Sequence, residues 1–203
     1  MSRPSPRRVG LLLLTGGASA RMGADKAGLD AGGVPLALRP VLALRPLCGE
    51  VVLAGRAVAG IDAPVVLDPH PGAGPLAGLV SGAEALSTDF IVVVACDMPA
   101  VEPGLVGLLL ELLADAGPGV QAAACADAAG RLEPLPLVMR REARGLLQAA
   151  ALAGAQALQE GLAALAVLVV GEPDWRPADP GATSFENWNR PGDVRPLPPP
   201  PLP

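Results

Sequence analysis

The stretch "LTGGASARMGADK", residues 14–26, directly follows an apolar run over Val9–Leu14. Its thirteen positions hold three glycines, Arg21 and Lys26. Glycine lets backbone N–H groups approach phosphate oxygens, and an arginine fork and a lysine charge both suit phosphate. The segment is neither GxGxxG nor a Walker A loop, because Ala27 follows Lys26 where Ser or Thr is required. We therefore expect a triphosphate-binding loop at the end of a first strand.

Outward from this segment, apolar runs alternate with stretches that suit helices. The predicted strands are Val9–Leu14, Val51–Leu53, Val65–Leu67, Ile91–Ala95, Ala122–Ala124 and Val167–Val170. The predicted helices are Leu76–Leu86, Pro103–Ala116 and Glu142–Leu165, with a short or kinked one in Pro35–Leu47, which Pro40 and Pro46 interrupt. Continuous apolar strands suit a sheet covered on both faces. The alternation predicts one α/β domain with a doubly wound, mostly parallel sheet.

Composition sets the boundaries of this domain. The chain has 203 residues, and aromatic residues make up 2% of it, so the core must be built from Leu, Val and Ala. We expect a flexible N-terminus over 1–8, the catalytic domain over 9–195 and a Pro-rich tail over 196–203. A net charge of −5 argues against nucleic-acid binding. No apolar run is long enough for a signal peptide or a membrane span, which predicts a cytoplasmic protein without membrane contact.

Cysteine and histidine usage excludes a zinc site. The chain has three cysteines and one histidine, and no CxxC pair. We expect reduced, buried thiols.

Two aspartates follow predicted strands. Asp97 comes after the buried run Ile91–Ala95, at the strand end where open α/β sheets bind ligands. A carboxylate there suits a hard cation held together with substrate phosphates, and the alternative is a helix N-cap. Asp68 follows another strand, and the alternative for this residue is a turn-forming aspartate.

The longer segment "LTGGASARMGADKAGLDAGGVPL", residues 14–36, closely resembles the signature of the molybdenum cofactor guanylyltransferases (MobA) within the sugar-nucleotidyltransferase-like superfamily. Four further segments agree in the same order: "LDPHPGAGPLAGL" (67–79), "VVVACDMPAVEP" (92–103), "EPLPLVMR" (133–140) and "NWNRPGDV" (187–194). The resemblance thus runs from about residue 9 to 195. Thr15 replaces the usual Ala, and Gly28 replaces a usual Leu. Leu53 stands where some members place an asparagine that contacts the guanine or ribose.

The resemblance implies a set of site residues on a nucleotidyltransferase (Rossmann-like) architecture. It implies nucleotide binding by Leu14, Thr15, Gly16, Gly17, Lys26, Asp68 and Asp97, catalytic roles for Lys26, Arg21 and Asp97, and Mg²⁺ binding by Asp97. Asn187 and Asn189 either face the second substrate or hold the terminal loop together. Arg131 either faces that anionic substrate or is a solvated loop cation. Trp188, between the two asparagines, is expected to pack a corner.

The implied reaction transfers GMP from GTP to molybdenum-bearing molybdopterin and releases pyrophosphate. Its partners would be GTP, molybdopterin, and a molybdoenzyme or the chaperone that matures it. Two alternatives stay open at this point. One is a transferase of the same superfamily that uses CTP or another acceptor, and the other is a non-catalytic nucleotide-binding protein that delivers the cofactor.

Overall fold

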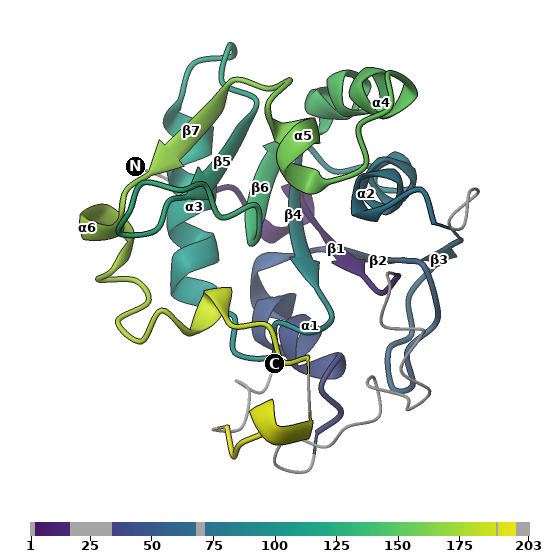
Figure 1. Ribbon diagram of the computed structural model, residues 1–203, viewed down its shortest axis with the longest axis vertical. Coiled ribbons are helices and arrows are strands. Elements are labelled where there is room, and N and C mark those ends of the chain that lie inside the picture. Colours follow the sequence, from purple (N-terminus) through teal and green to yellow (C-terminus); the bar gives the residue numbers. More distant parts are fainter. Residues whose placement is uncertain (1–2, 17–33, 68–71, 190, 198–203) are drawn as a thin grey trace.

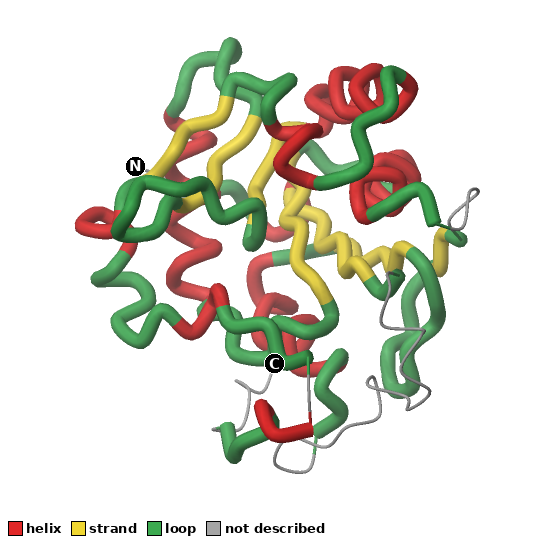
Figure 2. Tube along the Cα trace, viewed as in Figure 1, coloured by secondary structure: helices red, strands yellow, loops and turns green. Residues whose placement is uncertain are grey.

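A seven-stranded sheet forms the centre of the computed structural model, which describes residues 3–16, 34–67, 72–189 and 191–197 (Figure 1). Its strands are β1 (Val9–Leu14), β2 (Glu50–Ala54), β3 (Val65–Val66), β4 (Phe90–Ala95), β5 (Ala122–Cys125), β6 (Leu137–Arg140) and β7 (Val167–Val170). Their order across the sheet is β3-β2-β1-β4-β6-β5-β7. Figure 2 shows these strands in yellow between helices on either side.

Most strand pairs are parallel, as predicted. β1 pairs in parallel with β2 and with β4, β2 with β3, and β5 with β7. β6 is the exception, because it runs antiparallel to both β4 and β5. All strands except β6 therefore present their carboxyl ends at one edge of the sheet, which we call the carboxyl edge.

Six α-helices lie within the described ranges. They are α1 (Leu38–Leu44), α2 (Pro75–Glu84), α3 (Pro103–Asp115), α4 (Arg144–Leu152), α5 (Leu158–Leu162) and α6 (Glu172–Trp175). Short 3-10 helices are η1 (Pro6–Arg8), η4 (Arg45–Leu47), η5 (Arg141–Ala143), η6 (Thr183–Phe185) and η7 (Pro191–Asp193). Pro40 lies in the first turn of α1, where its missing N–H costs little. This explains why the segment forms a short helix, as predicted.

Alternating strand residues supply two separate cores. In β1, Leu11 and Leu13 pack into the core beneath α1 and α3, which we call the α1/α3 face. Leu12 and Leu14 pack on the opposite face, against α2 and α4. Figure 1 shows α2, α4 and α5 grouped together, apart from α1 and α3. Burial on both faces is the physical reason that the strands read as continuous apolar runs.

Two predictions about the second half of the chain are wrong. The predicted helix Glu142–Leu165 is two helices, because Gly154 adopts a φ of 104° just after α4. The Glu160 carboxylate then accepts the backbone N–H groups of Gln156 and Ala157, which begins α5. Strand β6 is missing from the predicted strands, because its short apolar run lies between a proline pair and an alanine-rich helix.

The cysteines behave largely as expected. All three are free thiols, with Cys48 and Cys125 buried and Cys96 half-buried. Burial raises the pKa of Cys48 and of Cys125 to about 12, so both stay protonated near neutral pH. Across the described ranges, none of the helices combines the length and apolar character needed to span a bilayer.

At the N-terminus, the described residues 3–8 include η1, and the Arg3 guanidinium lies 3.1 Å from the Glu111 carboxylate. The domain boundaries given above stay predictions.

Candidate functional site

The carboxyl ends of β1, β2 and β4 lie side by side at the centre of the carboxyl edge. Leu14, the last residue of β1, pairs with Ala54 of β2 on one side and Ala95 of β4 on the other. The Cys96 N–H then donates to the Leu14 carbonyl at 3.0 Å, which carries the pairing one residue further. We call residues 14–26 the glycine segment. Asp97, the residue after Cys96, is therefore held close to the point where this segment leaves β1.

Several residues implied by the resemblance lie outside the described ranges: Gly17, Arg21, Lys26 and Asp68. The two ends of segment 17–33 are described, however, and both lie near Asp97. One end follows Gly16 after β1, and the other returns at Leu36, which packs against Trp188. The Trp188 N–H donates to the Asp97 carbonyl at 2.8 Å.

The first residues of the glycine segment have their donors committed. The N–H groups of Thr15 and Gly16 both donate to the Ala54 carbonyl, at 2.8 and 3.1 Å. Leu14 is buried, and its carbonyl accepts the Cys96 N–H. Backbone donors for a phosphate must therefore come from residues after Gly16. Nucleotide binding by Leu14, Thr15 and Gly16 stays a prediction.

The Thr15 side chain ties β1 to the turn that follows β2. Its hydroxyl accepts the Arg56 N–H at 2.8 Å and lies 2.8 Å from the Arg56 carbonyl. Gly55, between Ala54 and Arg56, adopts a φ of 121°. A Cβ at Gly55 would lie 2.4 Å from the Gly16 nitrogen. Only glycine allows this close approach, so the turn of residues 54–56 is fixed against the start of the glycine segment.

Asp97 lies in a turn five residues before the N-cap of α3. Glu102 occupies that N-cap position, so the helix-cap interpretation of Asp97 is wrong. Asp97 is half-buried, and the Met98 N–H donates to the Ala95 carbonyl, which closes the turn. The carboxylate thus follows the central strand β4 without serving a helix.

A C-terminal segment, residues 179–189, holds the loop that carries Asp97; we call it the strap. The Glu102 N–H donates to the Ser184 hydroxyl at 2.9 Å, and the Thr183 hydroxyl donates to the Ala100 carbonyl at 2.9 Å. Together with the Trp188–Asp97 contact, these bonds attach the strap at both ends of loop 97–102.

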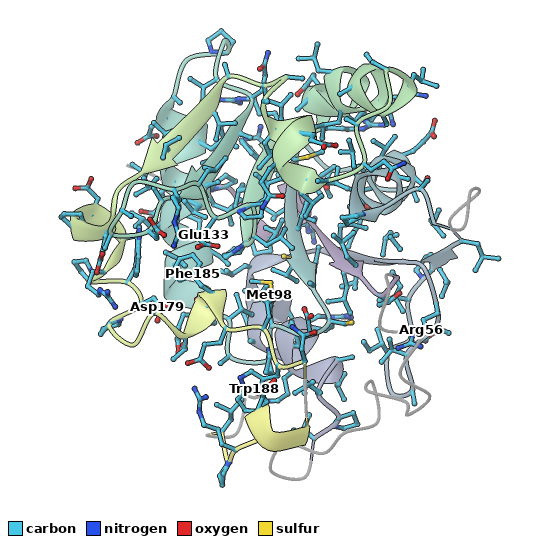
Figure 3. The ribbon with its side chains drawn as sticks, viewed as in Figure 1. Arg56, Met98, Glu133, Asp179, Phe185 and Trp188 are labelled. Atoms are coloured by element: carbon cyan, nitrogen blue, oxygen red, sulfur yellow. The ribbon has the colours of Figure 1, made fainter. Side chains whose placement is uncertain are left out.

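Asp179 organises the strap itself. Its carboxylate is 1% exposed and accepts the N–H groups of Thr183 and Ser184, at 3.0 and 2.9 Å. Burial and the negative charge of Asp179 raise the pKa of the Glu102 carboxyl above its usual value. In Figure 3, Met98 and Trp188 lie between Arg56 on one side and Asp179 and Phe185 on the other.

Arg131 lies in the turn between β5 and β6, at the same edge of the sheet. Its guanidinium pairs with Asp127 at 2.7 Å, and its side chain is 82% exposed. Hydrogen bonds from the Arg131 backbone and side chain lower the pKa of the Asp127 carboxyl. The position fits a solvated loop cation, and a role toward the second substrate stays a prediction.

Asn187 and Asn189 are exposed on either side of Trp188, which is 3% exposed. Trp188 packs a corner against Leu36, as expected, and the Arg195 guanidinium lies 5.1 Å from the centre of its ring. The Asn189 N–H donates to the Asp193 carboxylate at 2.7 Å. Both asparagines thus lie at the protein surface and form contacts within the terminal loop, and a role toward the second substrate stays a prediction.

Leu53 is fully buried on the α1/α3 face. Its side chain packs in the core and cannot contact a nucleotide, unlike the asparagine of some family members. The resemblance implies GTP as the nucleotide, and the burial of Leu53 shows that this side chain does not select it. Gly55, Arg56 and Asp179 are not among the residues predicted for the site; the one local signal was a glycine two residues after the predicted strand Val51–Leu53.

Comparisons with known proteins identify relatives over nearly the whole chain. The family model described as "MobA-like NTP transferase domain" matches residues 11–168. A probable molybdenum cofactor guanylyltransferase from Chloroflexus aggregans is 34% identical over 193 residues, which cover 91% of this chain and 90% of that protein. A molybdenum cofactor guanylyltransferase from Bordetella pertussis is 37% identical over 64% of this chain and 69% of that protein.

Solved structures agree on the fold. The crystal structure of molybdopterin-guanine dinucleotide biosynthesis protein A from Archaeoglobus fulgidus matches with a TM-score of 0.75 and 26% identity, over 91% of this chain and 94% of that chain. The 2-C-methyl-D-erythritol 4-phosphate cytidylyltransferase from Thermus thermophilus matches with a TM-score of 0.64 and 22% identity, over 90% of this chain and 94% of that chain. At that identity, the second likeness shows the fold alone.

Proposed function

Because the chain belongs to the family of MobA-like NTP transferases, we propose that it transfers GMP from GTP to molybdenum-bearing molybdopterin. The products are the guanine dinucleotide form of the cofactor and pyrophosphate. The observation that carries this proposal is the hydrogen bond between Cys96 and Leu14, which joins the ends of β4 and β1. This bond brings Asp97 beside the start of the glycine segment. A triphosphate on that segment would lie next to a carboxylate.

The transfer is an in-line substitution at the α-phosphorus. A terminal phosphate oxygen of molybdopterin forms the new P–O bond, while the bond from the α-phosphorus to the α–β bridging oxygen breaks. The electron pair of that bond leaves on pyrophosphate. No general base is required, because the attacking phosphate is already ionised. Catalysis then depends on positioning and on offsetting negative charge.

Two cations of segment 14–26 would supply positive charge that offsets the negative charge of the triphosphate. Lys26 would neutralise charge on the α-phosphate, and Arg21 would hold the leaving pyrophosphate. Support comes from the two ends of segment 17–33, which both lie near Asp97. The second substrate would be bound on the side of the strap, by Asn187 and Asn189, with Arg131 as a further contact.

Asp97 would hold the Mg²⁺ that the proposal includes. Within residues 3–16, 34–67, 72–189 and 191–197, no three His, Cys, Asp or Glu side chains converge to form a metal cage. A single carboxylate fits Mg²⁺ nevertheless, because this ion commonly takes one or two carboxylates together with substrate phosphates and water. When bound, the ion would offset negative charge on the triphosphate.

The test is a turnover assay with the purified chain, Mg²⁺ and molybdenum-loaded molybdopterin. GTP, CTP, ATP and UTP are supplied separately, and released pyrophosphate is measured. We expect release with GTP and little with the other three. Preference for CTP would reassign the base, and GTP binding without pyrophosphate release would favour a non-catalytic delivery protein.

A further inference from the structure

The turn after β2 carries an arginine that the proposed reaction does not yet use. Arg56 is half-buried at the carboxyl edge, and its backbone is bonded to the Thr15 hydroxyl through both its N–H and its carbonyl. Among the described residues, the Arg56 guanidinium forms no hydrogen bond or ion pair. The chain thus fixes the backbone of this residue rigidly and leaves five side-chain donors for a ligand.

The order of the strands indicates which part of a nucleotide Arg56 would meet. β1 lies between β4 and β2, so its exit segment is flanked by Asp97 on one side and by Arg56 on the other. A triphosphate above β1, with its reacting end toward Asp97, directs the nucleoside toward β2. Doubly wound nucleotide-binding sheets follow the same rule, with phosphates at the first strand and the ribose at the second.

Two departures from the family signature meet at this turn. Leu53 replaces an asparagine that contacts the guanine or ribose in some members, and it is buried in the core. Thr15 replaces the usual alanine and supplies the hydroxyl that holds Arg56. One change removes a polar contact from β2, and the other fixes a cation three residues further along the chain. We propose that Arg56 reads the base of the bound nucleotide, with Thr15 as its positioning residue.

The chemistry of the guanidinium selects guanine. Arginine offers only donors, and O6 and N7 of guanine are two adjacent acceptors that match its fork. Adenine presents a donor beside N7, and cytosine carries a donor at N4, so both oppose the fork. The inference rests on the proposed function for the identity of the nucleotide, and it adds how this chain distinguishes GTP from the alternatives.

The experiment compares GTP with 7-deaza-GTP, in which a C–H group replaces N7. Binding is measured by calorimetry without acceptor, and kcat/KM by pyrophosphate release. For the wild-type chain we expect roughly tenfold weaker binding of 7-deaza-GTP. Arg56→Ala should weaken GTP binding on the order of 10- to 100-fold and bring the ratio of the two affinities close to one.

Matched variants separate base reading from other effects. Thr15→Ala should lower the preference for GTP over 7-deaza-GTP, and Thr15→Ser should restore it. Arg144→Ala removes the same charge from the start of α4, at the opposite edge of the sheet, and should behave as wild type. Thermal unfolding of each variant checks that the fold is retained.

Two results would overturn the assignment of Arg56. Arg56→Ala could weaken GTP and 7-deaza-GTP by the same factor, which indicates a phosphate contact, or it could change neither. Turnover of GTP together with either result leaves the proposed function intact. Selective turnover of CTP would overturn the guanine assignment but retain nucleotidyl transfer. Absence of turnover with every nucleotide rejects the proposed function, while the calorimetric ratio still decides the role of Arg56.

Discussion

The segments that follow β2 and β4, residues 54–56 and 97–102, lie on either side of β1. They are held in place by different means. The turn at 54–56 is fixed by backbone contact, with Gly55 against Gly16 and the Thr15 hydroxyl on Arg56. Loop 97–102 is fixed from far away in the sequence, by a strap whose Ser184 lies 82 residues beyond Glu102.

We infer from this difference that the segments after β2 and β4 have separate roles. Under the proposed function, the β4 side would place the carboxylate on which transfer of any nucleotide depends. Under the proposal for Arg56, the β2 side would place the donor that decides which nucleotide is used. Damage to the first should therefore abolish turnover, whereas damage to the second should change selectivity, unless it also disturbs the shared contact with β1.

Replacing the carboxylate itself gives the largest expected effect. Asp97→Asn keeps the size of the side chain and removes its charge, so we expect turnover with GTP to fall by about 10²–10³. Lys26→Ala should give a comparable loss. Pyrophosphate release measures the rate, and thermal unfolding should show that the fold survives. Near-wild-type turnover of Asp97→Asn would reject its role.

Gly55→Ala tests the backbone contact on the β2 side. The new Cβ would lie 2.4 Å from the Gly16 nitrogen, at a φ that disfavours alanine, so we expect a loss of about 3 kcal/mol in unfolding free energy. Gly130→Ala is the matched control, because Gly130 also has a positive φ but meets no atom within 4 Å. Urea unfolding compares the two. An equal loss in both variants would show that the contact with Gly16 contributes nothing.

Asp179→Ala tests the strap. It leaves the buried N–H groups of Thr183 and Ser184 without their acceptor, which should cost about 2 kcal/mol in unfolding free energy. Because the strap also holds loop 97–102, the Mg²⁺ concentration for half-maximal turnover should rise while the GTP/7-deaza-GTP affinity ratio stays unchanged. Asp174→Ala, an exposed change on α6, is the control. An altered affinity ratio would contradict the separation of the two sides.

The smallest effect concerns Glu102. Its pKa is raised by burial and by Asp179, so the native state binds its proton more tightly than the unfolded chain does. Stability from this group therefore falls as pH rises from the ordinary glutamate pKa through the raised one. Glu102→Gln should give a small gain in unfolding free energy at pH 7 that disappears in acid. A gain that persists in acid would point to another cause.

Much of the fold could be predicted from the sequence because its strands are buried on both faces. Runs such as Val9–Leu14 and Ile91–Ala95 are apolar at successive positions, which marks them clearly. The short β6 and the break at Gly154 lie beside alanine-rich sequence with weak periodicity, so neither was found. The resemblance to the MobA family is confirmed over residues 11–168.

The candidate site could be predicted only in part. Asp97 could be proposed from the sequence because a carboxylate after a buried strand is a local pattern. The Thr15–Arg56 and Ser184–Glu102 contacts join residues 41 and 82 positions apart through side chain and backbone, and no local pattern encodes them. Only the fold brings these partners together.

A crystal structure of the chain with Mg²⁺ and α,β-methylene GTP, which cannot release pyrophosphate, would test the whole arrangement at once. We expect the triphosphate to lie above the end of β1, with Lys26 and Asp97 facing each other across it. A structure with Lys26 and Asp97 on opposite sides of the molecule would contradict the account.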